Sequence, residues 1–347
     1  MSTTSIPPCD TLPALSWVTD VEIASDDVGP HDAAITATLI EYGGQPYVFY
    51  LAFVASKTSP GYLWKAVRLS NNTWVRTGID LVNTALYLAA TVVNGTPAVV
   101  YGLPSTLEAF RYGTYVNSIW TDTIITLILK GDGATGPSIA DIGGVPYIAY
   151  TETATVLRLS HKSGAIWINE TIDTGVGIAV ANILGEPAIV YQRTISPVSV
   201  RYAHYNGTSW ITSTIEASSL NYQLDLIEYL SQPLVTYGSW YTHLSVKYAQ
   251  YNGTTWTVGS VNSSITETMW PRFGIACQTP ILAVFYRNVC QVYSYDGTWS
   301  LLADYPYYTV NNDNKVPCSA TGISDFPAVV YRTGASGSEE LWYSEST

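Results

Sequence analysis

The chain has 347 residues, of which 47% are hydrophobic and 12% are charged, and its formal net charge is −12. This acidic balance repels a phosphate backbone and so excludes nucleic acid as a general partner. No run of about 18 apolar residues is present, which predicts that no helix spans a membrane.

A short apolar phrase recurs along the chain, as in GGQPYVFY (43–50) and NGTPAVVY (94–101). Each copy begins near a proline and ends on a tyrosine, and successive tyrosines lie 41 to 51 residues apart. A period in the mid-forties is typical of a β-propeller, in which each repeat is one four-stranded blade. The seven copies end at Tyr50, Tyr101, Tyr150, Tyr191, Tyr237, Tyr286 and Tyr331.

A second phrase follows the first in each unit, as in RYAHYNGTSW (201–210), and it ends on a tryptophan. In the third unit the four strand-like pieces are PSIADI, VPYIAY, TVLRLSH and IWINETI, separated by Gly-Gly and Lys-Ser-Gly turns that suit tight hairpins. The second piece is apolar along its whole length, which predicts a strand buried on both faces. No segment has a 3.6-residue period, so we expect almost no helix. The tryptophans are Trp74, Trp120, Trp167, Trp210, Trp256 and Trp299.

The count of phrases predicts how the ring closes. Seven copies of the first phrase are followed by only six of the second, so the last unit lacks its fourth strand. The segment SWVTDVEIAS (16–25) resembles SWITSTIEAS (209–218) and supplies it. We expect residues near 15–24 to pair antiparallel with residues near 340–345 as the outermost strand of the last blade, which leaves no exposed sheet edge.

The sequence therefore predicts an all-β fold: a seven-bladed β-propeller with four antiparallel strands per blade, closed by the N-terminal strand that completes the last blade. The chain is one domain, residues 1–347, and its units are called repeats 1 to 7. The predicted bounds are 14–25 for the closing strand and 30–80, 81–130, 131–174, 175–218, 219–264, 265–303 and 304–347 for the repeats.

The loops divide into two classes that lie on opposite faces of a propeller. Short turns join the first strand to the second and the third to the fourth, and Asn71, Asn206 and Asn252 lie in such turns. Variable segments join the second strand to the third and one blade to the next. Diversified loops on a rigid scaffold are where binding sites usually lie, so we expect the site on the variable face.

An aromatic and arginine cluster is the candidate binding site on that face. Exposed aromatic rings with arginine are typical of sugar stacking and of interface hot spots. The alternative is that these rings fill gaps between blades. The cluster comprises Trp240, Tyr241 and His243 in the loop after the second strand of repeat 5, Trp270 and Arg272 in the connection that enters repeat 6, and Arg287 within repeat 6.

A cation recurs nine residues before the blade tryptophan in five repeats. Five like charges at one repeat position could ring an anionic ligand. The interpretation that we favour is a solvated or salt-bridged position on the third strand. The residues are Lys65, Arg111, Arg158, Arg201 and Lys247, with Cys290 and Trp342 at the same place in repeats 6 and 7.

Signatures of catalysis are sparse. The four histidines have no metal-ligand spacing, and no nucleophile elbow or phosphate-binding loop is present, so we expect no cofactor, no metal and no enzymatic activity. SYDGTW (294–299) is similar to the Asp-box of sialidases, which is a structural turn. Arg193, Arg287 and Arg332 follow strand-ending tyrosines, and a sialidase-like site would need such a triad with acids and a tyrosine nucleophile.

The phrases G-x-P-x-[IV]-x-Y, L-[KR]-Y-A and [ND]-G-x-x-W resemble propeller repeats of bacterial and archaeal surface or secreted proteins. They are more loosely similar to tectonin-type and fucose-binding propeller lectins. The resemblance covers residues 14–345 and implies the architecture of the blade but no particular ligand.

We therefore expect a non-enzymatic recognition or assembly propeller that binds a protein partner or a neutral glycan through its variable face. The alternatives are a lectin proper and a sialidase-like glycoside hydrolase. The start MSTTSIPPCD lacks the features of a secretory signal, which leaves room for a virion component as well as a cell-surface protein, in either case as part of a larger assembly.

The cysteines test the assignment of strands in repeat 6. Cys277 would lie on the first strand and Cys290 on the third, with the second strand between them. Strands about 4.8 Å apart put the two near 10 Å, beyond the roughly 7 Å limit for a bridge. The sequence predicts no disulfide between them.

Overall fold

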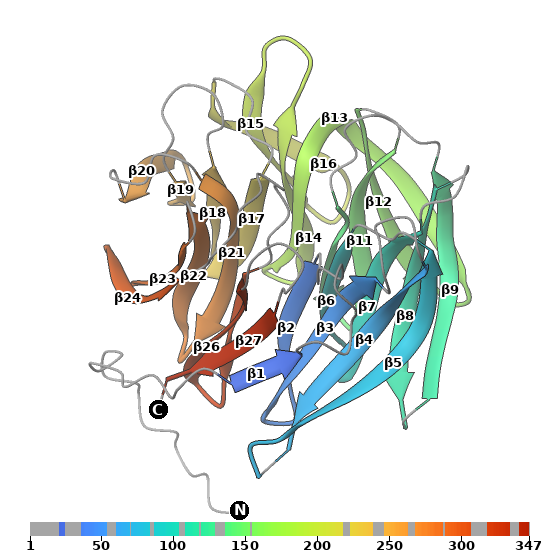
Figure 1. Ribbon diagram of the computed structural model, residues 1–347. Coiled ribbons are helices and arrows are strands. Elements are labelled where there is room, and N and C mark those ends of the chain that lie inside the picture. Colours follow the sequence, from blue (N-terminus) through green and yellow to red (C-terminus); the bar gives the residue numbers. More distant parts are fainter. Residues whose placement is uncertain are drawn as a thin grey trace, which may run out of the picture.

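The computed structural model describes the strands and most of the turns that join them. Within the described residues the chain forms 27 β-strands and no helix. All paired strands run antiparallel, as predicted for this all-β sequence (Figure 1). The described residues are 21–24, 36–53, 60–69, 71–83, 87–103, 108–117, 119–128, 136–152, 155–217, 223–238, 246–262, 268–286, 289–306, 318–333 and 340–346.

Repeats 1, 2, 5 and 6 each form a separate four-stranded sheet in sequence order. Repeat 1 contains β2 (Thr36–Tyr42), β3 (Gln45–Phe53), β4 (Pro60–Arg68) and β5 (Trp74–Asn83). Repeat 2 contains β6 (Leu88–Val93), β7 (Thr96–Leu103), β8 (Glu108–Val116) and β9 (Ile119–Ile128). Repeat 5 contains β17 (Gln223–Tyr229), β18 (Gln232–Gly238), β19 (Val246–Tyr251) and β20 (Trp256–Asn262). Repeat 6 contains β21 (Thr268–Ala276), β22 (Thr279–Tyr286), β23 (Val289–Tyr295) and β24 (Trp299–Pro306).

Repeats 3 and 4 share one long strand and so form a continuous seven-stranded sheet. Residues 166–174 of that strand, β13, pair with β12, and residues 175–183 pair with β14. The same strand thus ends one repeat and begins the next. The seven strands are β10 (Ser138–Ile142), β11 (Val145–Glu152), β12 (Val156–Ser163), β13 (Ile166–Ile183), β14 (Glu186–Arg193), β15 (Ser199–Tyr205) and β16 (Trp210–Glu216).

The two ends of the chain meet in the last sheet, where the N-terminal strand β1 (Val21–Ala24) lies beside the C-terminal strand (Figure 1). The strand order is β1-β27-β26-β25, with β25 (Ser319–Ile323), β26 (Phe326–Thr333) and β27 (Glu340–Glu345). Val21 lies opposite Tyr343, and Ala24 lies opposite Leu341. The predicted closing strand is confirmed for residues 21–24, and residues 14–20 and 25 lie outside the described residues.

The first strands of the repeats line the centre of the molecule. Each contacts the first strand of the next repeat, in the order β2, β6, β10, β13, β17, β21 and β25, and β25 in turn contacts β2. The sheets therefore follow one another around a common axis (Figure 1).

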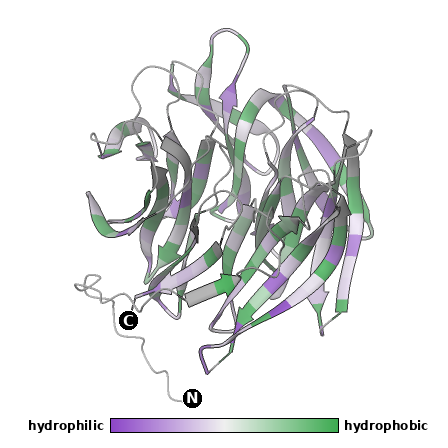
Figure 2. Cartoon of the chain, viewed as in Figure 1, coloured by the Kyte–Doolittle hydropathy of each residue, from purple (hydrophilic) through white to green (hydrophobic). Residues whose placement is uncertain are grey.

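The apolar core lies between neighbouring sheets, and Figure 2 shows hydrophobic residues on strands throughout the molecule. The second strand is buried on both faces, as predicted: Ala98, Val99, Val100 and Tyr101 are all inaccessible to solvent. The blade tryptophan packs on the preceding repeat, as where the ring centroids of Trp167 and Tyr112 lie 5.3 Å apart. Each tryptophan thereby helps to fill the space between two sheets.

In repeats 1, 4, 5 and 6 an Asn or Asp side chain stabilises the turn between the third and fourth strands. Asn206 Oδ1 accepts hydrogen bonds from the amide N–H of Thr208 at 3.0 Å and from its hydroxyl at 2.8 Å. Asp296, in the Asp-box-like segment, accepts the same pair of bonds from Thr298 at 3.2 and 3.1 Å. These bonds lower the pKa of the Asp296 carboxyl. The segment is therefore a structural turn, as predicted.

The structure corrects the place of Cys277, which lies in the turn between β21 and β22 and not on the first strand, because β21 ends at Ala276. Cys290 and Cys318 are buried free thiols, so Cys290 takes no part in a bridge to Cys277. The strand β22 separates β21 from β23, as the spacing of the sequence predicts.

Candidate functional site

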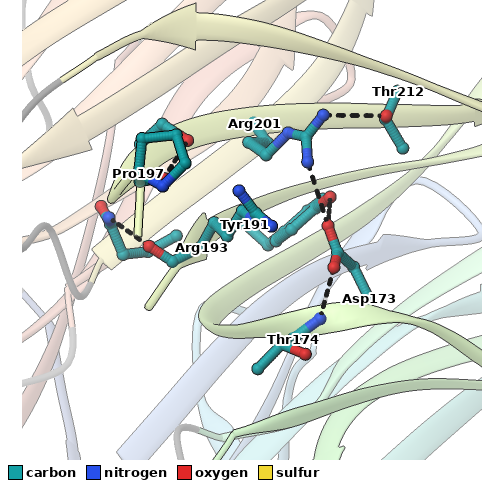
Figure 3. A network of polar contacts seen from close by, with 9 residues as sticks. Asp173, Thr174, Tyr191, Arg193, Pro197, Arg201 and Thr212 are labelled. Carbon is teal, nitrogen blue, oxygen red and sulfur yellow. Dashed lines mark hydrogen bonds and ion pairs between the residues drawn. The ribbon is translucent and has the colours of Figure 1, made fainter. Parts of the chain in front are cut away.

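The variable-loop end of the boundary between repeats 3 and 4 carries a network of charged side chains (Figure 3). Tyr191 donates its hydroxyl hydrogen to Asp173 Oδ2 at 2.6 Å. Arg201 Nη1 approaches the same oxygen at 3.3 Å, and Arg201 Nη2 donates to Thr212 Oγ1 at 2.9 Å. The amide N–H of Thr174 donates to Asp173 Oδ1 at 2.8 Å. Asp173 therefore receives donors from two repeats and joins them.

Strand register explains why these side chains meet. Tyr191 on β14 lies directly opposite Arg201 on β15, so the two side chains leave the sheet on the same face. Asp173 stands on β13 just before that strand passes from repeat 3 into repeat 4. Gly175 follows, and a Cβ atom there would lie 2.6 Å from the Tyr191 ring, so the close approach requires glycine.

The environment suppresses ionisation of the buried tyrosine. Burial raises the pKa of Tyr191 well above its ordinary value, and the hydrogen bond to Asp173 raises it further. Arg201 and Arg193 lower it by their charges but do not reverse the shift. Tyr191 is thus a hydrogen-bond donor at neutral pH and a poor candidate for a general base or a nucleophile.

Two other boundaries repeat this arrangement. Tyr237 of repeat 5 donates to Glu216 of repeat 4 at 3.0 Å, and Lys247 Nζ lies 2.5 Å from the same carboxylate. At the boundary of repeats 1 and 2, Tyr101 donates to Asp80 at 2.6 Å. An acid six residues after the blade tryptophan is the signal for this contact, and it was not among the predictions. These acids are Asp80, Asp173 and Glu216.

The repeated cations form salt bridges in four of the five repeats, which confirms the favoured interpretation. These four cations therefore do not form a ring of unpaired charges around an anionic ligand. The pairs are Arg111 with Asp122, Arg158 with Glu152, Arg201 with Asp173, and Lys247 with Glu216.

Lys65 departs from this position because the hairpin of repeat 1 is one residue longer. Arg68 lies opposite Trp74, six residues on, where in repeat 4 Tyr205 lies opposite Trp210, five residues on. This shift moves Lys65 to the other face of the sheet. Lys65 is buried, and its Nζ atom lies 3.5 Å from the centroid of the Tyr115 ring.

Arg193 differs from the other cations of this network. It stands two residues after Tyr191 and on the same face of β14. Among the described residues it has no ion pair, and its side chain makes no hydrogen bond, while its charge acts on Tyr191. The Nε atoms of Arg193 and Arg201 are both buried without a hydrogen-bond partner within the described residues. The network therefore contains more hydrogen-bond donors than the described acceptors satisfy.

The predicted aromatic cluster lies largely outside the described residues. Trp240, Tyr241, His243 and Arg287 all fall there. The cluster therefore stays a prediction as a binding site.

The positions of Trp270 and Arg272 correct one expectation. Both belong to β21 and not to a connecting segment. The pairing register shifts between Met269 and Arg272, and such a bulge accommodates Pro271, which cannot donate to a ladder. Arg272 lowers the pKa of Asp225, which burial raises. Arg272 thus acts on a buried acid between β17 and β21.

The part of the chain that the structure describes offers neither a candidate metal centre nor a candidate membrane span. It holds no group of three or more His, Cys, Asp and Glu residues that could bind a metal ion. It also holds no helix long and apolar enough to cross a membrane. For the sialidase-like triad, only Arg193 has a described side chain, so that triad stays a prediction.

Comparison with known proteins identifies the fold but no family. No family model and no curated protein sequence matches the chain. Among solved structures, it is similar to the six-bladed fucose-recognising lectin of Aleuria aurantia, with 15% identity and a TM-score of 0.55 over 78% of this chain and 95% of the lectin. It is also similar to AofleA of Arthrobotrys oligospora, with 12% identity and a TM-score of 0.56 over 83% and 90% of the two chains.

A third similar structure is an enzyme. A polysaccharide lyase described as an ulvan lyase, solved with a -[GlcA(1-4)Rha3S]- ligand, has 12% identity and a TM-score of 0.61 over 93% of this chain and 95% of its own. Identities this low show the fold alone. The chain is therefore a β-propeller, as the repeat period predicts.

Proposed function

We propose that this protein is a seven-bladed propeller that binds carbohydrate without chemically altering it. Three observations support seven blades although the described strands form six sheets. The continuous strand β13 serves two repeats, seven first strands follow one another around the axis, and seven apolar clusters each join two successive repeats. The Aleuria lectin, by contrast, has six blades.

The observation that carries carbohydrate binding is the network of Asp173, Tyr191, Arg193 and Arg201 at the variable end of a blade boundary. Fixed carboxylate and guanidinium groups beside a loop are the polar groups that orient a ligand rich in hydroxyls. Propeller lectins share the fold. A glycan partner therefore accounts for both the scaffold and the spare donors better than an assembly role alone.

The aromatic cluster of Trp240, Tyr241, His243, Trp270, Arg272 and Arg287 belongs to this proposal as a second contact region on the variable face. Location on a cell surface or a virion, a place in a larger assembly, and kinship with bacterial and archaeal surface propellers remain predictions from the sequence.

A glycan array of neutral and acidic oligosaccharides, followed by titration calorimetry of the best ligands, tests the function. We expect saturable binding with dissociation constants in the micromolar to millimolar range. A purified, folded protein that binds no glycan, but captures a protein partner, would replace this proposal with the assembly role.

A polysaccharide lyase is the second candidate, because the ulvan lyase shares the largest part of this chain among the structures described above. Removal of the proton beside a uronate carboxyl requires a base. The described boundary tyrosines are poor bases, since burial and carboxylate neighbours raise the pKa of Tyr101, Tyr191 and Tyr237. Release of unsaturated uronate from an acidic polysaccharide, followed by ultraviolet absorbance, would establish the lyase and refute the non-enzymatic proposal.

A further inference from the structure

We propose that Arg193 and Arg201 form an anion subsite that takes the carboxylate or the sulfate group of an acidic sugar. The proposal rests on the carbohydrate-binding function and names the class of ligand at one boundary. It places the anion beside Tyr191, at the variable-loop end of the boundary between repeats 3 and 4 (Figure 3).

The charge balance of this boundary sets it apart. Asp173 bonds to Arg201, and Arg193 adds a second guanidinium, so two positive charges face one negative charge. At the boundary of repeats 4 and 5, Lys247 is matched by Glu216. At the boundary of repeats 1 and 2, Arg111 acts with two carboxylates, Asp80 and Asp122. An excess of positive charge is thus confined to one of these three places, in a chain of net charge −12.

The unsatisfied donors are the second observation. The Nε–H groups of Arg193 and Arg201 are buried and lack a partner within the described residues. Buried donors are nearly always hydrogen-bonded in native proteins, and an unpaired one is costly. A guanidinium fork matches the two oxygens of a carboxylate or a sulfate, so an anion beside the outer ends of these two side chains would supply charge-assisted hydrogen bonds and the negative charge that the described residues do not give Arg193.

Arg193 is not explained by the repeat. The residue two positions after the strand-ending tyrosine is Ala52 in repeat 1, Leu103 in repeat 2, Glu152 in repeat 3 and Thr333 in repeat 7. In repeat 3, Glu152 uses this position to pair with Arg158 at 2.6 Å. A repeat reproduces residues that the scaffold needs, so a cation that occurs here in repeat 4, with no partner among the described residues, is better explained by a ligand than by the scaffold.

The adjoining loop gives the subsite a surface. It connects β14 to β15, and Ile195, Ser196 and Pro197 are exposed on it, beginning two residues after Arg193. An aliphatic side chain and a proline ring offer contact to the apolar face of a sugar, and a serine hydroxyl can exchange hydrogen bonds with its hydroxyls. An acidic pyranose could therefore place its charged group beside the arginines and its ring and hydroxyls against the loop.

The test compares matched ligands on the full-length protein by titration calorimetry. The probes are a tetrasaccharide that contains glucuronate, the same tetrasaccharide with its carboxyl groups reduced to alcohols, and a sulfated neutral tetrasaccharide. We expect the wild-type protein to prefer one or both of the acidic probes to the reduced one. The Arg193→Gln variant should lose at least about tenfold in affinity for the preferred acidic probe and change little toward the reduced probe.

Two further variants keep the test decisive. Arg158→Gln removes a cation that is already paired with Glu152 and should leave acidic-sugar affinity unchanged. Arg193→Lys keeps the charge without the fork and should bind with intermediate affinity, which separates ligand contact from a folding defect. Equal affinity of wild type and Arg193→Gln for both acidic probes would overturn the subsite.

The two levels of inference can fail separately. Wild-type protein that binds the reduced probe, but neither acidic probe more tightly, would refute the anion subsite and leave carbohydrate binding intact. A folded protein that binds no glycan of any kind would refute both.

Discussion

Two blade boundaries carry a tyrosine, an acid and a cation at the same strand positions but differ in charge balance. They are the boundary between repeats 4 and 5 and the boundary between repeats 3 and 4. At the former, Glu216 accepts from Tyr237 and Lys247, and the charges cancel. At the latter, Asp173 accepts from Tyr191 and Arg201, and Arg193 stands beside them with no partner among the described residues. The first group is complete as a link between two blades. The second contains the same link and one cation more, and that surplus distinguishes a candidate site from a structural contact.

The largest effect should come from removing the acid where the surplus lies. In Asp173→Asn, Arg201 loses its described ion pair, Tyr191 loses its charged acceptor, and the described network keeps no carboxylate to offset Arg193 and Arg201. We expect the free energy of unfolding to fall by about 2–3 kcal/mol, since removing one partner leaves the other charges uncompensated. Urea unfolding monitored by circular dichroism gives the value.

Glu216→Gln is the matched control for that substitution. It leaves one cation, Lys247, unpaired and should cost less than Asp173→Asn. An equal or larger loss for Glu216→Gln would mean that Arg193 does not share the electrostatics of its boundary, and the contrast between the two sites would disappear.

Alkaline pH should destabilise the boundaries that bury Tyr50, Tyr101, Tyr191 and Tyr237. Burial raises the pKa of Tyr50 to about 12, and it raises the pKa of Tyr101, Tyr191 and Tyr237 as well. The folded state therefore holds these protons more tightly than the unfolded chain, whose tyrosines titrate near pH 10. Stability is fully present below pH 10 and is lost as pH rises, at about 1.4 kcal/mol per pH unit for Tyr50 between pH 10 and 12.

Thermal melting of the protein at pH 9, 10 and 11 checks this expectation. A melting temperature that stays constant from pH 9 to 11 would show that the tyrosines are not held in their neutral form by the folded protein.

The sequence predicted the scaffold well because the scaffold is repeated. The period of the tyrosines, the fully apolar second strand and the N-terminal closing segment each follow from a pattern that occurs several times, and Val21–Ala24 pairs with β27 as expected. The position of Lys65 was wrong because counting back from Trp74 assumes that all hairpins have one length. One additional residue in the turn reverses the face of every side chain before it.

The candidate site was harder to predict, because a site is made of departures from the repeat. The sequence shows Arg193 as a residue that follows a strand-ending tyrosine, but it does not show that Arg201 has a described ion pair and Arg193 has none. That distinction depends on Asp173, which reaches across from the preceding repeat through the bent course of β13. Contacts between repeats depend on three-dimensional packing that no local pattern encodes.

A binding measurement tests whether the aromatic cluster contributes to glycan affinity in addition to Arg193 at the boundary of repeats 3 and 4. Substitution of both Trp240 and Trp270 by Ala should weaken binding of the preferred glycan by at least about tenfold, since aromatic hot-spot residues commonly contribute 2 kcal/mol or more. Calorimetry with the folded double variant provides the comparison. Unchanged affinity would confine recognition to the Arg193 boundary or to another part of the variable face.

The smallest expected change in the free energy of unfolding is that of Arg193→Gln, and it tests the comparison between the two boundaries most directly. Because Arg193 has no described ion pair and no side-chain hydrogen bond, Arg193→Gln should change the free energy of unfolding by no more than about 0.5 kcal/mol. Relief of repulsion from Arg201 would make the change slightly favourable. Arg201→Gln, in contrast, removes bonds to both Asp173 and Thr212 and should be destabilising. Unfolding curves of the two variants, measured side by side, separate a residue kept for the fold from one kept for a ligand. A loss for Arg193→Gln as large as that for Arg201→Gln would assign Arg193 to the scaffold and would make the two boundaries alike.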